Sequence, residues 1–296
     1  MTILAGGDCR IIGEELNDER GSSIHKDNQE PFDEKQQDAT IASSSSKKNR
    51  SYSGVKNQHK TKYFINWLLQ TFPQLHVPRT QSQDIQPDGT LHRQPTETPL
   101  ESTPLVIDIA GGKGELAARL IVCQRLRVVM IDPRESDVPL CFEKTVLPKL
   151  PAVWRCRFQR RQQEDAHILE KTFQERFQQY QMYFQDDTAA THPEVGALIE
   201  KAALLVGMHA DGATEAIVDT ALRYKKPFCV VPCCVFPTLF HTRTIRVRDE
   251  EGNEREVPVR SYEQFCQYLM NKHPRIQQSI LPFDGRNVAI WWDGTS

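Results

Sequence analysis

The sequence lacks both an excess of charge of one sign and any long apolar run. Its 296 residues carry 37 Lys and Arg against 39 Asp and Glu, for a formal net charge of −2. This balance excludes a protein that coats nucleic acid with uniform positive charge, although a local basic groove remains possible. The longest apolar runs, such as 202–208 and 228–236, are far shorter than the ~18 residues of a membrane-spanning helix. We therefore expect no membrane partner.

The sequence also lacks the cysteine spacing of a structural zinc site or of a small disulfide-linked scaffold. The eight cysteines include no C-x-x-C pair, which argues against a structural zinc site, and they lack the dense spacing of a small disulfide-linked scaffold. We predict reduced thiols and no metal ligands. The first ten residues, MTILAGGDCR, show no apolar core of a secretory signal. These features predict a cytoplasmic or nuclear protein.

Apolar residues are scarce in the N-terminal fifth of the chain. Residues 1–57 are rich in Asp, Glu, Gln, Asn, Ser and Lys, and cannot bury enough apolar area to offset the chain entropy lost on folding. We predict a disordered tail over 1–57 and one folded domain over 58–296. A helix over 59–72 is expected to open that domain, because Phe64, Trp67 and Leu68 recur at helical spacing.

From residue 104 onward, short apolar strands alternate with helices. Strands are predicted over 105–110, 128–131, 153–158, 202–208 and 227–232, and helices over 114–126, 162–184, 194–201, 213–224 and 261–272. Segments 276–281 and 287–292 flank Asp284-Gly285, which is a hairpin signal. A second hairpin is expected over 244–259, and a loop or insertion over 77–103. This alternation predicts a parallel sheet covered on both faces, with an antiparallel element at its end.

One strand–turn–helix segment, LVIDIAGGKGE over 105–115, carries most of the chemical information. Gly112 and Gly114 let the backbone turn sharply and let a ligand approach the main chain. The helix that follows offers free N–H groups to a polar or anionic ligand. Asp132, at the end of the next strand, is placed to accept both hydroxyls of a ribose. The segment therefore predicts a site for a nucleoside-containing cofactor.

Two cofactor classes fit this segment. The residues from Gly112 to Ala117 match the loose G-x-G-x-x-A pattern of nicotinamide-dependent oxidoreductases. Asp108, however, precedes the glycines at the end of the first strand, where a carboxylate would repel a pyrophosphate. A carboxylate suits S-adenosylmethionine, whose ammonium and sulfonium groups are positively charged. Asp108 therefore favours the adenosyl cofactor, and the oxidoreductase remains the weaker alternative.

The segment DIAGGKG over 108–114 resembles the first motif of the class I S-adenosylmethionine-dependent methyltransferases, D-x-G-x-G-x-G, with Ala110 in place of the first glycine. The resemblance implies a Rossmann-like α/β fold: a doubly wound, mostly parallel seven-stranded sheet with a reversed last strand. The predicted C-terminal hairpin agrees with that arrangement. The resemblance also implies that Asp108, Ala110, Gly112 and Gly114 hold the amino-acid end of S-adenosylmethionine, and that Asp132 holds its ribose.

A narrower likeness lies downstream. The segments GMHADG (207–212) and VVPCC (230–234) are similar to the G-L-H-x-C-G and C-C segments of one methyltransferase subgroup. That subgroup includes eukaryotic tRNA ribose methyltransferases and less characterised methyltransferase-like proteins. Asp211 stands where the subgroup has Cys. The likeness leaves the methyl acceptor unidentified, with RNA as a candidate, and it points to His209 and Asp211 as the catalytic residues that face the acceptor.

Alternatives remain for individual residues in these segments. Asp211 is either a catalytic residue or the N-cap of the helix that follows it. Cys233 and Cys234 are adjacent, so we expect them to face opposite sides of a strand, one in the core and one lining the pocket. Glu164 and Asp165 are candidates for an adenine contact after the third predicted strand.

Two alternatives concern the partners of the whole protein. The segment WRCRFQRR over 154–161 mixes Arg with aromatic residues, and is either an RNA-contacting edge or a strand with solvated charges. A methyltransferase that acts on an unidentified acceptor is the favoured reading. The alternative from another class is a non-catalytic binding module that keeps the methyltransferase fold. The presence of Asp211 where the subgroup has Cys is a hint of this alternative.

Overall fold

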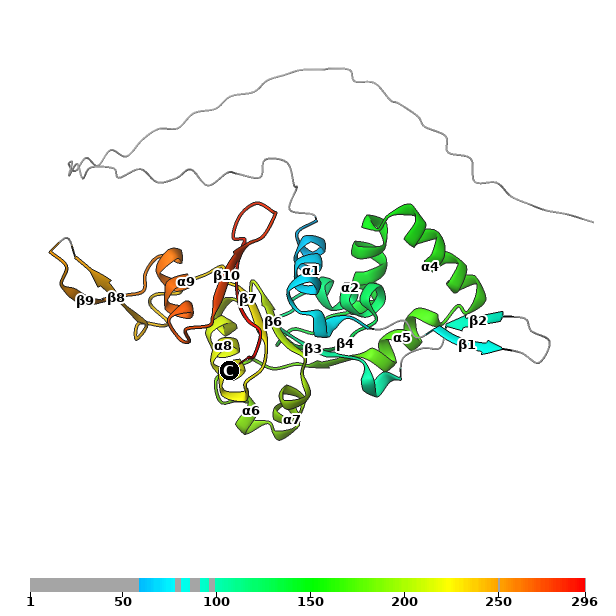
Figure 1. Ribbon diagram of the computed structural model, residues 1–296, viewed down its shortest axis with the longest axis horizontal. Helices are drawn as coiled ribbons and strands as arrows, with labels where there is room; N and C mark the ends of the chain where they lie inside the picture. The colour runs from blue at the N-terminus through cyan, green and yellow to red at the C-terminus, as the bar shows by residue number, and fades with distance from the viewer. Residues whose placement is uncertain (1–58, 78–80, 86–90, 96–98, 250, 296) are drawn as a thin grey trace, which may run out of the picture. The chain divides into compact units, whose positions relative to one another are not determined.

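The computed structural model describes residues 59–77, 81–85, 91–95, 99–249 and 251–295, so the predicted disordered tail over 1–57 lies outside the described residues. Its main sheet has seven strands in the spatial order β5-β4-β3-β6-β7-β11-β10 (Figure 1). Their bounds are β3 (Leu105–Ile109), β4 (Arg127–Ile131), β5 (Phe177–Tyr180), β6 (Leu204–Met208), β7 (Phe228–Val231), β10 (Gln277–Ile280) and β11 (Val288–Trp292).

The last strand of this sheet runs against its neighbours. β11 is antiparallel to both β7 and β10, whereas the pairs β3–β4, β4–β5, β3–β6 and β6–β7 are parallel. The predicted fold class, a doubly wound and mostly parallel seven-stranded sheet with a reversed last strand, is therefore confirmed.

The order of strands creates one switch point in the sheet. The chain runs outward from β3 to β4 and β5, then crosses back to place β6 on the other side of β3. β3 and β6 pair directly, with Asp108 opposite Val206. Open α/β sheets bind ligands outside the carboxyl ends of strands at such a point. The fold thus brings the ends of β3 and β6 together at the expected binding edge.

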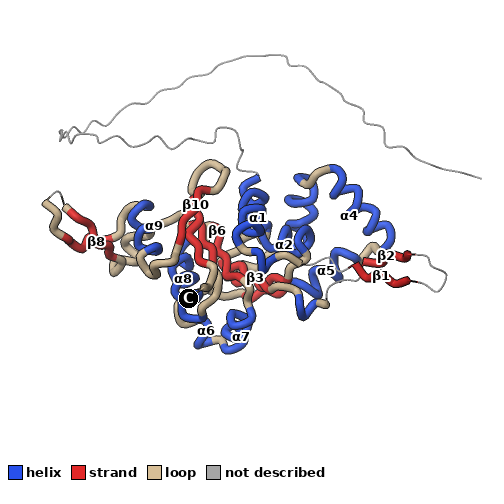
Figure 2. The backbone as a smooth tube through the Cα atoms, viewed as in Figure 1, coloured by secondary structure: helices blue, strands red, loops and turns tan. Residues whose placement is uncertain are grey.

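Helices cover both faces of the sheet (Figure 2). Side chains of successive strand residues point to opposite faces, so Val106 joins one apolar cluster and Ile107 the other. The first cluster includes residues of α1 (Lys60–Thr71), α2 (Glu115–Gln124), α3 (Val138–Cys141) and α5 (Ile168–Arg176). The second includes residues of α6 (Thr188–Thr191), α7 (Pro193–Lys201), α8 (Thr214–Tyr224) and α9 (Tyr262–Met270).

The helix predicted over 59–72 is present as α1, and an aromatic cluster fixes it to the sheet. The ring of Trp67 lies edge-on to those of Phe72 and Trp291, at centroid distances of 6.2 and 5.9 Å. Edge-to-face pairs of this kind add to the hydrophobic contribution of the buried rings. Because Trp291 belongs to β11, the packing holds the first helix of the domain against the last strand.

Two hairpins lie outside the main sheet. β8 (Thr244–Arg248) and β9 (Glu254–Pro258) confirm the hairpin predicted over 244–259. The segment 77–103, predicted as a loop or insertion, contains the paired strands β1 (Gln81–Ile85) and β2 (Leu91–Pro95). Among the described residues, no helix has the length and apolar character needed to cross a bilayer.

The sequence analysis predicted the strand that follows β4 at the wrong residues. Residues 153–158 belong to the helix α4 (Ala152–Glu164), and the helix predicted over 162–184 contains the end of α4, then α5, then β5. None of the residues of α4 is buried, so no apolar face marked it as a helix, and the alternation W-R-C-R-F imitated a strand. Glu164 ends α4 and Asp165 follows it. The prediction that these residues follow the third strand is wrong.

Candidate functional site

The Gly-rich turn between β3 and α2 is built from left-handed backbone. Ala110 has φ 56°, Gly112 has φ 61° and Gly114 has φ 76°. Ala110 adopts this conformation at a cost of roughly 1–2 kcal/mol for an L-residue. A Cβ added at Gly114 would collide with Val138 at 2.6 Å, whereas one at Gly112 would meet only Nη2 of Arg134, at 3.8 Å. Gly112 is therefore the position at which the backbone of the turn is open to a ligand.

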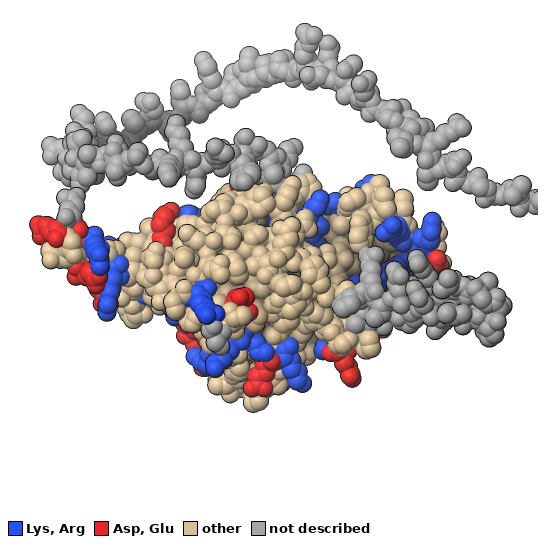
Figure 3. Space-filling view, viewed as in Figure 1, with Lys and Arg blue, Asp and Glu red and all other residues tan. Residues whose placement is uncertain are grey.

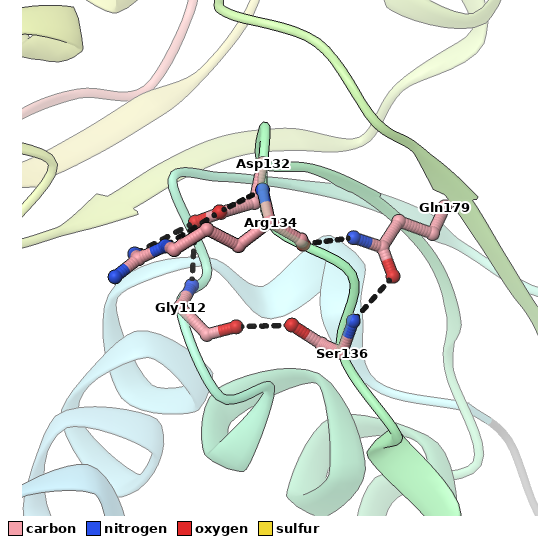
Figure 4. Close-up of polar contacts among 5 residues, drawn as sticks. All are labelled: Gly112, Asp132, Arg134, Ser136 and Gln179. Carbon is pink, nitrogen blue, oxygen red and sulfur yellow. Dashed lines mark hydrogen bonds and ion pairs between the residues drawn. The ribbon is translucent and has the colours of Figure 1, made fainter.

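Asp132 joins this turn to the end of β4 (Figure 4). Its Oδ2 accepts a hydrogen bond from the backbone N–H of Gly112 at 2.9 Å, and its Oδ1 accepts one from the backbone N–H of Arg134, also at 2.9 Å. Burial raises the pKa of Asp132, but the hydrogen bonds from Arg134 and Gly112 outweigh it and leave the pKa below its ordinary value. The carboxylate is ionised at neutral pH and fixes the shape of the turn.

Gln179, a polar residue of β5, holds the loop after β4. Nε2 of Gln179 donates to the carbonyl of Arg134 at 2.7 Å, and its Oε1 accepts from the N–H of Ser136 at 3.3 Å. The Ser136 hydroxyl donates to the carbonyl of Gly112 at 2.5 Å (Figure 4). Gln179 was missed because the sequence placed β5 inside a helix. The local sequence FQQY carries no signal that would have found it, because this strand is polar and lies at the edge of the sheet.

The side chain of Arg134 covers the carboxylate of Asp132. Its Nε lies 3.1 Å from Oδ1 and its Nη2 lies 3.3 Å from Oδ2, while the arginine side chain itself is 75% exposed. Ribose hydroxyls that bind Asp132 must replace these two contacts. Because the Asp132 carboxylate is only 1% exposed, the hydroxyls must hydrogen-bond to it as well as the arginine does.

A cavity of about 500 Å³ opens beside Gly112. Its wall includes Arg134, Ser136, Leu140 and Lys144, which come from the loop after β4, from α3 and from the helical turn η4 (Phe142–Val146). Ligand sites for small molecules typically enclose ~300–1,000 Å³, so the cavity can hold a nucleoside. Its wall does not include Asp108, Asp132, His209 or Asp211.

Asp108 lies buried at the end of β3, directly under the turn. Its Oδ2 has no hydrogen-bond partner within the part of the chain that the structure describes. A Cβ at Gly111 would come within 2.7 Å of that oxygen, so the turn packs closely against the carboxyl group. Burial, and to a lesser extent the charge of Asp132, raises the pKa of Asp108 to about 7. A positive charge brought to the turn would favour its ionised form.

We expect Asp108 to make the protein less stable as pH rises from about 4 to about 7. Its pKa is raised from 3.8 to about 7 on folding, so between these values the folded state binds more protons than the unfolded state. The contribution to stability is full below pH 4 and is lost as pH rises through 7. Unfolding in urea at pH 5, 6, 7 and 8 should show this decline in the wild type, with a smaller slope in Asp108→Asn. Equal slopes of stability against pH in the two proteins would contradict a raised pKa of Asp108.

His209 follows β6 and is held by its backbone. Its φ is 61°, and its N–H donates to the carbonyl of Val231 at 3.0 Å. Its Nδ1 is buried, with no hydrogen-bond partner among the described residues. Burial and the charge of Lys60 lower the pKa of His209, and Asp211 opposes them in part. The imidazole is therefore neutral at pH 7 and able to accept a proton. Lys60, at the start of α1, was not a residue that sequence reasoning singled out.

Asp211 is not the N-cap of α8. The helix begins without a side-chain cap, and the hydroxyl of Thr214 donates to the backbone carbonyl of Asp211 at 2.9 Å. The Asp211 carboxylate is turned instead toward the segment after β7, where its Oδ1 accepts from Sγ of Cys233 at 3.0 Å. The capping alternative is wrong, and the exposed carboxylate faces the cysteines that follow β7.

Cys233 and Cys234 point the same way. Their sulfur atoms and an oxygen of Asp211 all lie within 4.8 Å of one another. The expectation that they face opposite sides of a strand is wrong, because β7 ends at Val231 and the alternation of a strand no longer applies beyond it. Burial, and then the hydrogen bond to Asp211, raises the pKa of Cys233 to about 12. A protonated thiol of this kind is a poor nucleophile.

The structure therefore forms two clusters at one edge of the sheet. Asp108 and Asp132 lie around the Gly-rich turn, and His209, Asp211 and Cys233 lie after β6 and β7. Arg134 connects the two clusters electrostatically: Asp132 is the main cause of its raised pKa, and Asp211 contributes.

The strand order distinguishes this sheet from the classic dinucleotide-binding sheet. The classic dinucleotide-binding sheet is parallel, in the order 3-2-1-4-5-6. Here the reversed strand β11 is inserted between β7 and β10, as the class I resemblance implies. The chain has the class I methyltransferase fold. No family model and no curated protein matches the chain.

Several solved methyltransferase structures are similar to this one at low identity. The methyltransferase domain of bacterial CtHen1-CN is 12% identical, with 79% of this chain and 97% of that chain covered and a TM-score of 0.38. An S-adenosylmethionine-dependent methyltransferase from Clostridium acetobutylicum is 11% identical, with coverage of 80% and 91% and a TM-score of 0.32. The glycopeptide N-methyltransferase MtfA is 12% identical, with coverage of 64% and 88% and a TM-score of 0.31.

Proposed function

We propose that this protein is a methyltransferase that uses S-adenosylmethionine. The observation that carries this proposal is the convergence of Asp108, Gly112 and Asp132 at the switch point of the sheet. Gly112 offers open backbone beside the cavity, Asp132 a carboxylate of the kind that accepts ribose hydroxyls, and Asp108 a buried carboxyl group with no cationic partner among the described residues. A cofactor with a cationic amino-acid end complements all three, whereas a pyrophosphate would meet two carboxyl groups.

The residues present suit the chemistry of methyl transfer. When bound, S-adenosylmethionine supplies a methyl group that its sulfonium has already activated. The protein then needs to orient an acceptor and remove one proton from it. His209 is neutral at pH 7 and Asp211 is an exposed carboxylate, so both can accept that proton.

The cofactor proposal is tested at Gly112. A Cβ there occupies the open face of the turn, so Gly112→Ala is expected to weaken S-adenosylhomocysteine binding by at least ~10-fold, or ~1.4 kcal/mol. Gly285→Ala is the matched control, since Gly285 also has positive φ and a Cβ there meets nothing within 4 Å. Calorimetric titration of both variants and the wild type measures the effect.

The same titration separates the cofactor classes. The wild type is expected to bind S-adenosylmethionine and S-adenosylhomocysteine, and not the nicotinamide dinucleotides. Binding of a nicotinamide cofactor alone would support the oxidoreductase. Binding of neither class would end the enzyme proposal, and unchanged affinity in Gly112→Ala would remove the turn from the site.

We propose RNA as the class of acceptor. The support comes from α4, where Arg155, Arg157, Arg160 and Arg161 are exposed and Trp154 is 41% exposed. Lys and Arg side chains lie over the α4 region, at the upper right of Figure 3. Positive charge beside an exposed aromatic ring suits a phosphate backbone with unstacked bases. The segment is a helix, so its interpretation as a strand is wrong.

The basic helix is joined to the wall of the cavity. The ring of Phe158 on α4 packs against that of Phe142 at a centroid distance of 5.2 Å. Phe142 begins η4, and Lys144 and Thr145 of the same turn line the cavity beside Gly112. An RNA bound along α4 would therefore lie beside the element that forms the cofactor cavity.

Methyl-labelled cofactor identifies the acceptor class. Incubation with fractionated cellular RNA, protein and metabolites is expected to place the label in RNA. Label in protein or metabolites would contradict the RNA proposal while supporting methyl transfer. Tight cofactor binding with no label in any fraction would favour the non-catalytic binding module.

A further inference from the structure

Asp211, Cys233 and Cys234 gather three metal-ligating side chains at one point. Their ligand atoms all lie within 4.8 Å of one another, and Sγ of Cys233 is 3.0 Å from Oδ1 of Asp211. We propose that these three side chains bind a zinc ion and leave its fourth coordination position open. This proposal replaces the sequence-based prediction of no metal ligands, which rested on the missing C-x-x-C spacing.

The spacing of the three ligand atoms fits a tetrahedral ion. Zinc binds sulfur at ~2.3 Å and carboxylate oxygen at ~2.0–2.2 Å, so ligand atoms in a tetrahedron lie about 3.5–3.8 Å apart. The separation of Cys233 Sγ from Asp211 Oδ1 is 3.0 Å and no pair exceeds 4.8 Å, so small side-chain movements bring the three atoms to this spacing. Two sulfur ligands and one carboxylate form a set that zinc, a borderline-soft ion, accepts.

The fold holds the two segments that supply these ligands. β6 and β7 are parallel neighbours with Met208 opposite Val231, so the residues that follow both strands emerge side by side. Nε of Arg243 lies 2.6 Å from Oε2 of Glu215 on α8, the helix that follows Asp211. Nη1 of Arg243 donates to the carbonyl of Val235 at 3.0 Å, just after the cysteines. A buried ion pair thus ties the segment of Asp211 to the segment of the cysteines.

The charge around the cluster is compatible with a bound metal. Without a metal, the Cys233 thiol keeps its proton and donates a hydrogen bond to Asp211. A coordinated thiol loses its proton to solvent, because the ion supplies the compensating charge. Two thiolates and one carboxylate around Zn²⁺ carry a net charge of −1. Arg286 acts electrostatically on Cys234 and Arg134 on Asp211, so cations already lie near the cluster.

The open position gives the metal a role in the reaction. Three protein ligands with one free position are typical of catalytic zinc, whereas structural zinc has four. His209 lies two residues before Asp211, at the same strand end. This part of the inference rests on the proposed methyl transfer: an acceptor oxygen or sulfur at the open position would lose its proton more readily.

Cobalt is the probe for this site, because Co²⁺ replaces zinc and its spectrum reports thiolate ligands. The chelator-treated full chain is expected to bind one equivalent of Co²⁺, with tetrahedral visible bands and a near-ultraviolet charge-transfer band of the intensity of two thiolates. Competition against a chromophoric chelator then gives the zinc affinity. In Cys233→Ser/Cys234→Ser we expect loss of the charge-transfer band and at least ~100-fold weaker zinc binding, a loss larger than that for mutation of an outer-shell partner.

Two variants control for the ligand assignment. Asp211→Asn is expected to keep the charge-transfer band and to weaken zinc binding. Cys156→Ser, which removes an exposed thiol on α4, is expected to change neither. A wild-type spectrum without two thiolates would overturn the site, even if the double variant failed to fold. An unchanged spectrum in a folded double variant, or loss of the band in Cys156→Ser, would also overturn it.

Calorimetry with S-adenosylhomocysteine separates this proposal from the proposed function. Metal binding without binding of S-adenosylhomocysteine would leave the zinc site standing and end the methyltransferase proposal. Binding of S-adenosylhomocysteine without the cobalt spectrum would end the zinc proposal and leave the methyltransferase proposal standing.

Discussion

Glu215→Ala is expected to lower the free energy of unfolding by about 3–5 kcal/mol, because it leaves a buried guanidinium without its partner. Arg243 is only 3% exposed and bonds to Glu215. The same carboxylate accepts from the Tyr268 hydroxyl and lies 2.8 Å from Nζ of Lys272. Burial alone would raise the pKa of Glu215, but these donors hold it below its ordinary value. The carboxylate is therefore ionised, and its loss exposes the full cost of burying Arg243.

Urea unfolding at pH 7 measures this loss, and Glu254→Ala is the control. Glu254 forms an ion pair with Arg248 at 3.2 Å, but both side chains are exposed. An exposed pair contributes ~0–1 kcal/mol, so the control is expected to stay near the wild type. Equal and small losses in the two variants would show that the buried pair does not stabilise the fold. A large loss confined to Glu215→Ala would support its role in holding the segment after β7.

His209→Asn and Asp211→Asn are each expected to lower methyl transfer to the acceptor by ~10²–10⁴-fold. His209 can take the proton of the acceptor, and Asp211 acts on the same proton, as a base without zinc and as a ligand of the metal with it. Asn is the suitable replacement at both positions, since it tolerates the left-handed backbone that these residues adopt. Both residues follow β6 and lie outside the Gly-rich turn and the end of β4, which we propose hold the cofactor. The affinity for S-adenosylhomocysteine is therefore expected to stay within a few-fold of the wild type.

Rates of label transfer to the acceptor fraction, measured with methyl-labelled cofactor, give the result. Thermal unfolding of each variant establishes that the fold persists. Normal transfer in both variants would remove His209 and Asp211 from the mechanism. Weak cofactor binding together with a lower melting temperature would reassign the two residues to packing. Loss of transfer with intact cofactor binding would support their position on the acceptor side.

Local pattern was enough to predict most of the fold. Short apolar runs bounded by turn residues identified β3, β4, β6 and β7, because a strand buried on both faces is apolar throughout. The Gly-rich turn and the carboxylate after β4 are adjacent to those strands, so the motif alone identified Asp108, Gly112 and Asp132. The structure brings those three residues together, and their role in holding a cofactor stays a prediction.

The tail and the partners remain predictions. Residues 1–57 lie outside the described part of the chain, and the acceptor awaits the labelling experiment. Composition alone predicts a disordered tail, because too few of these residues are apolar to form a core.

Tertiary structure decided what local pattern could not. β5 is a polar strand at the edge of the sheet that becomes a strand only by pairing with β4, so no local signal distinguished it from a helix. Without β5, the sequence could not place Gln179 against the loop that carries Ser136. Likewise, Asp211 and the two cysteines meet only because β6 and β7 are parallel neighbours.

The sequence by itself thus determined the buried strands β3, β4, β6 and β7 and the Gly-rich turn, because each depends on neighbours within a few positions. The side-chain directions of Asp211, Cys233 and Cys234 depend on where two strands end and on the buried pair of Glu215 and Arg243. Such contacts join residues far apart in the chain, and only the folded sheet sets their distances.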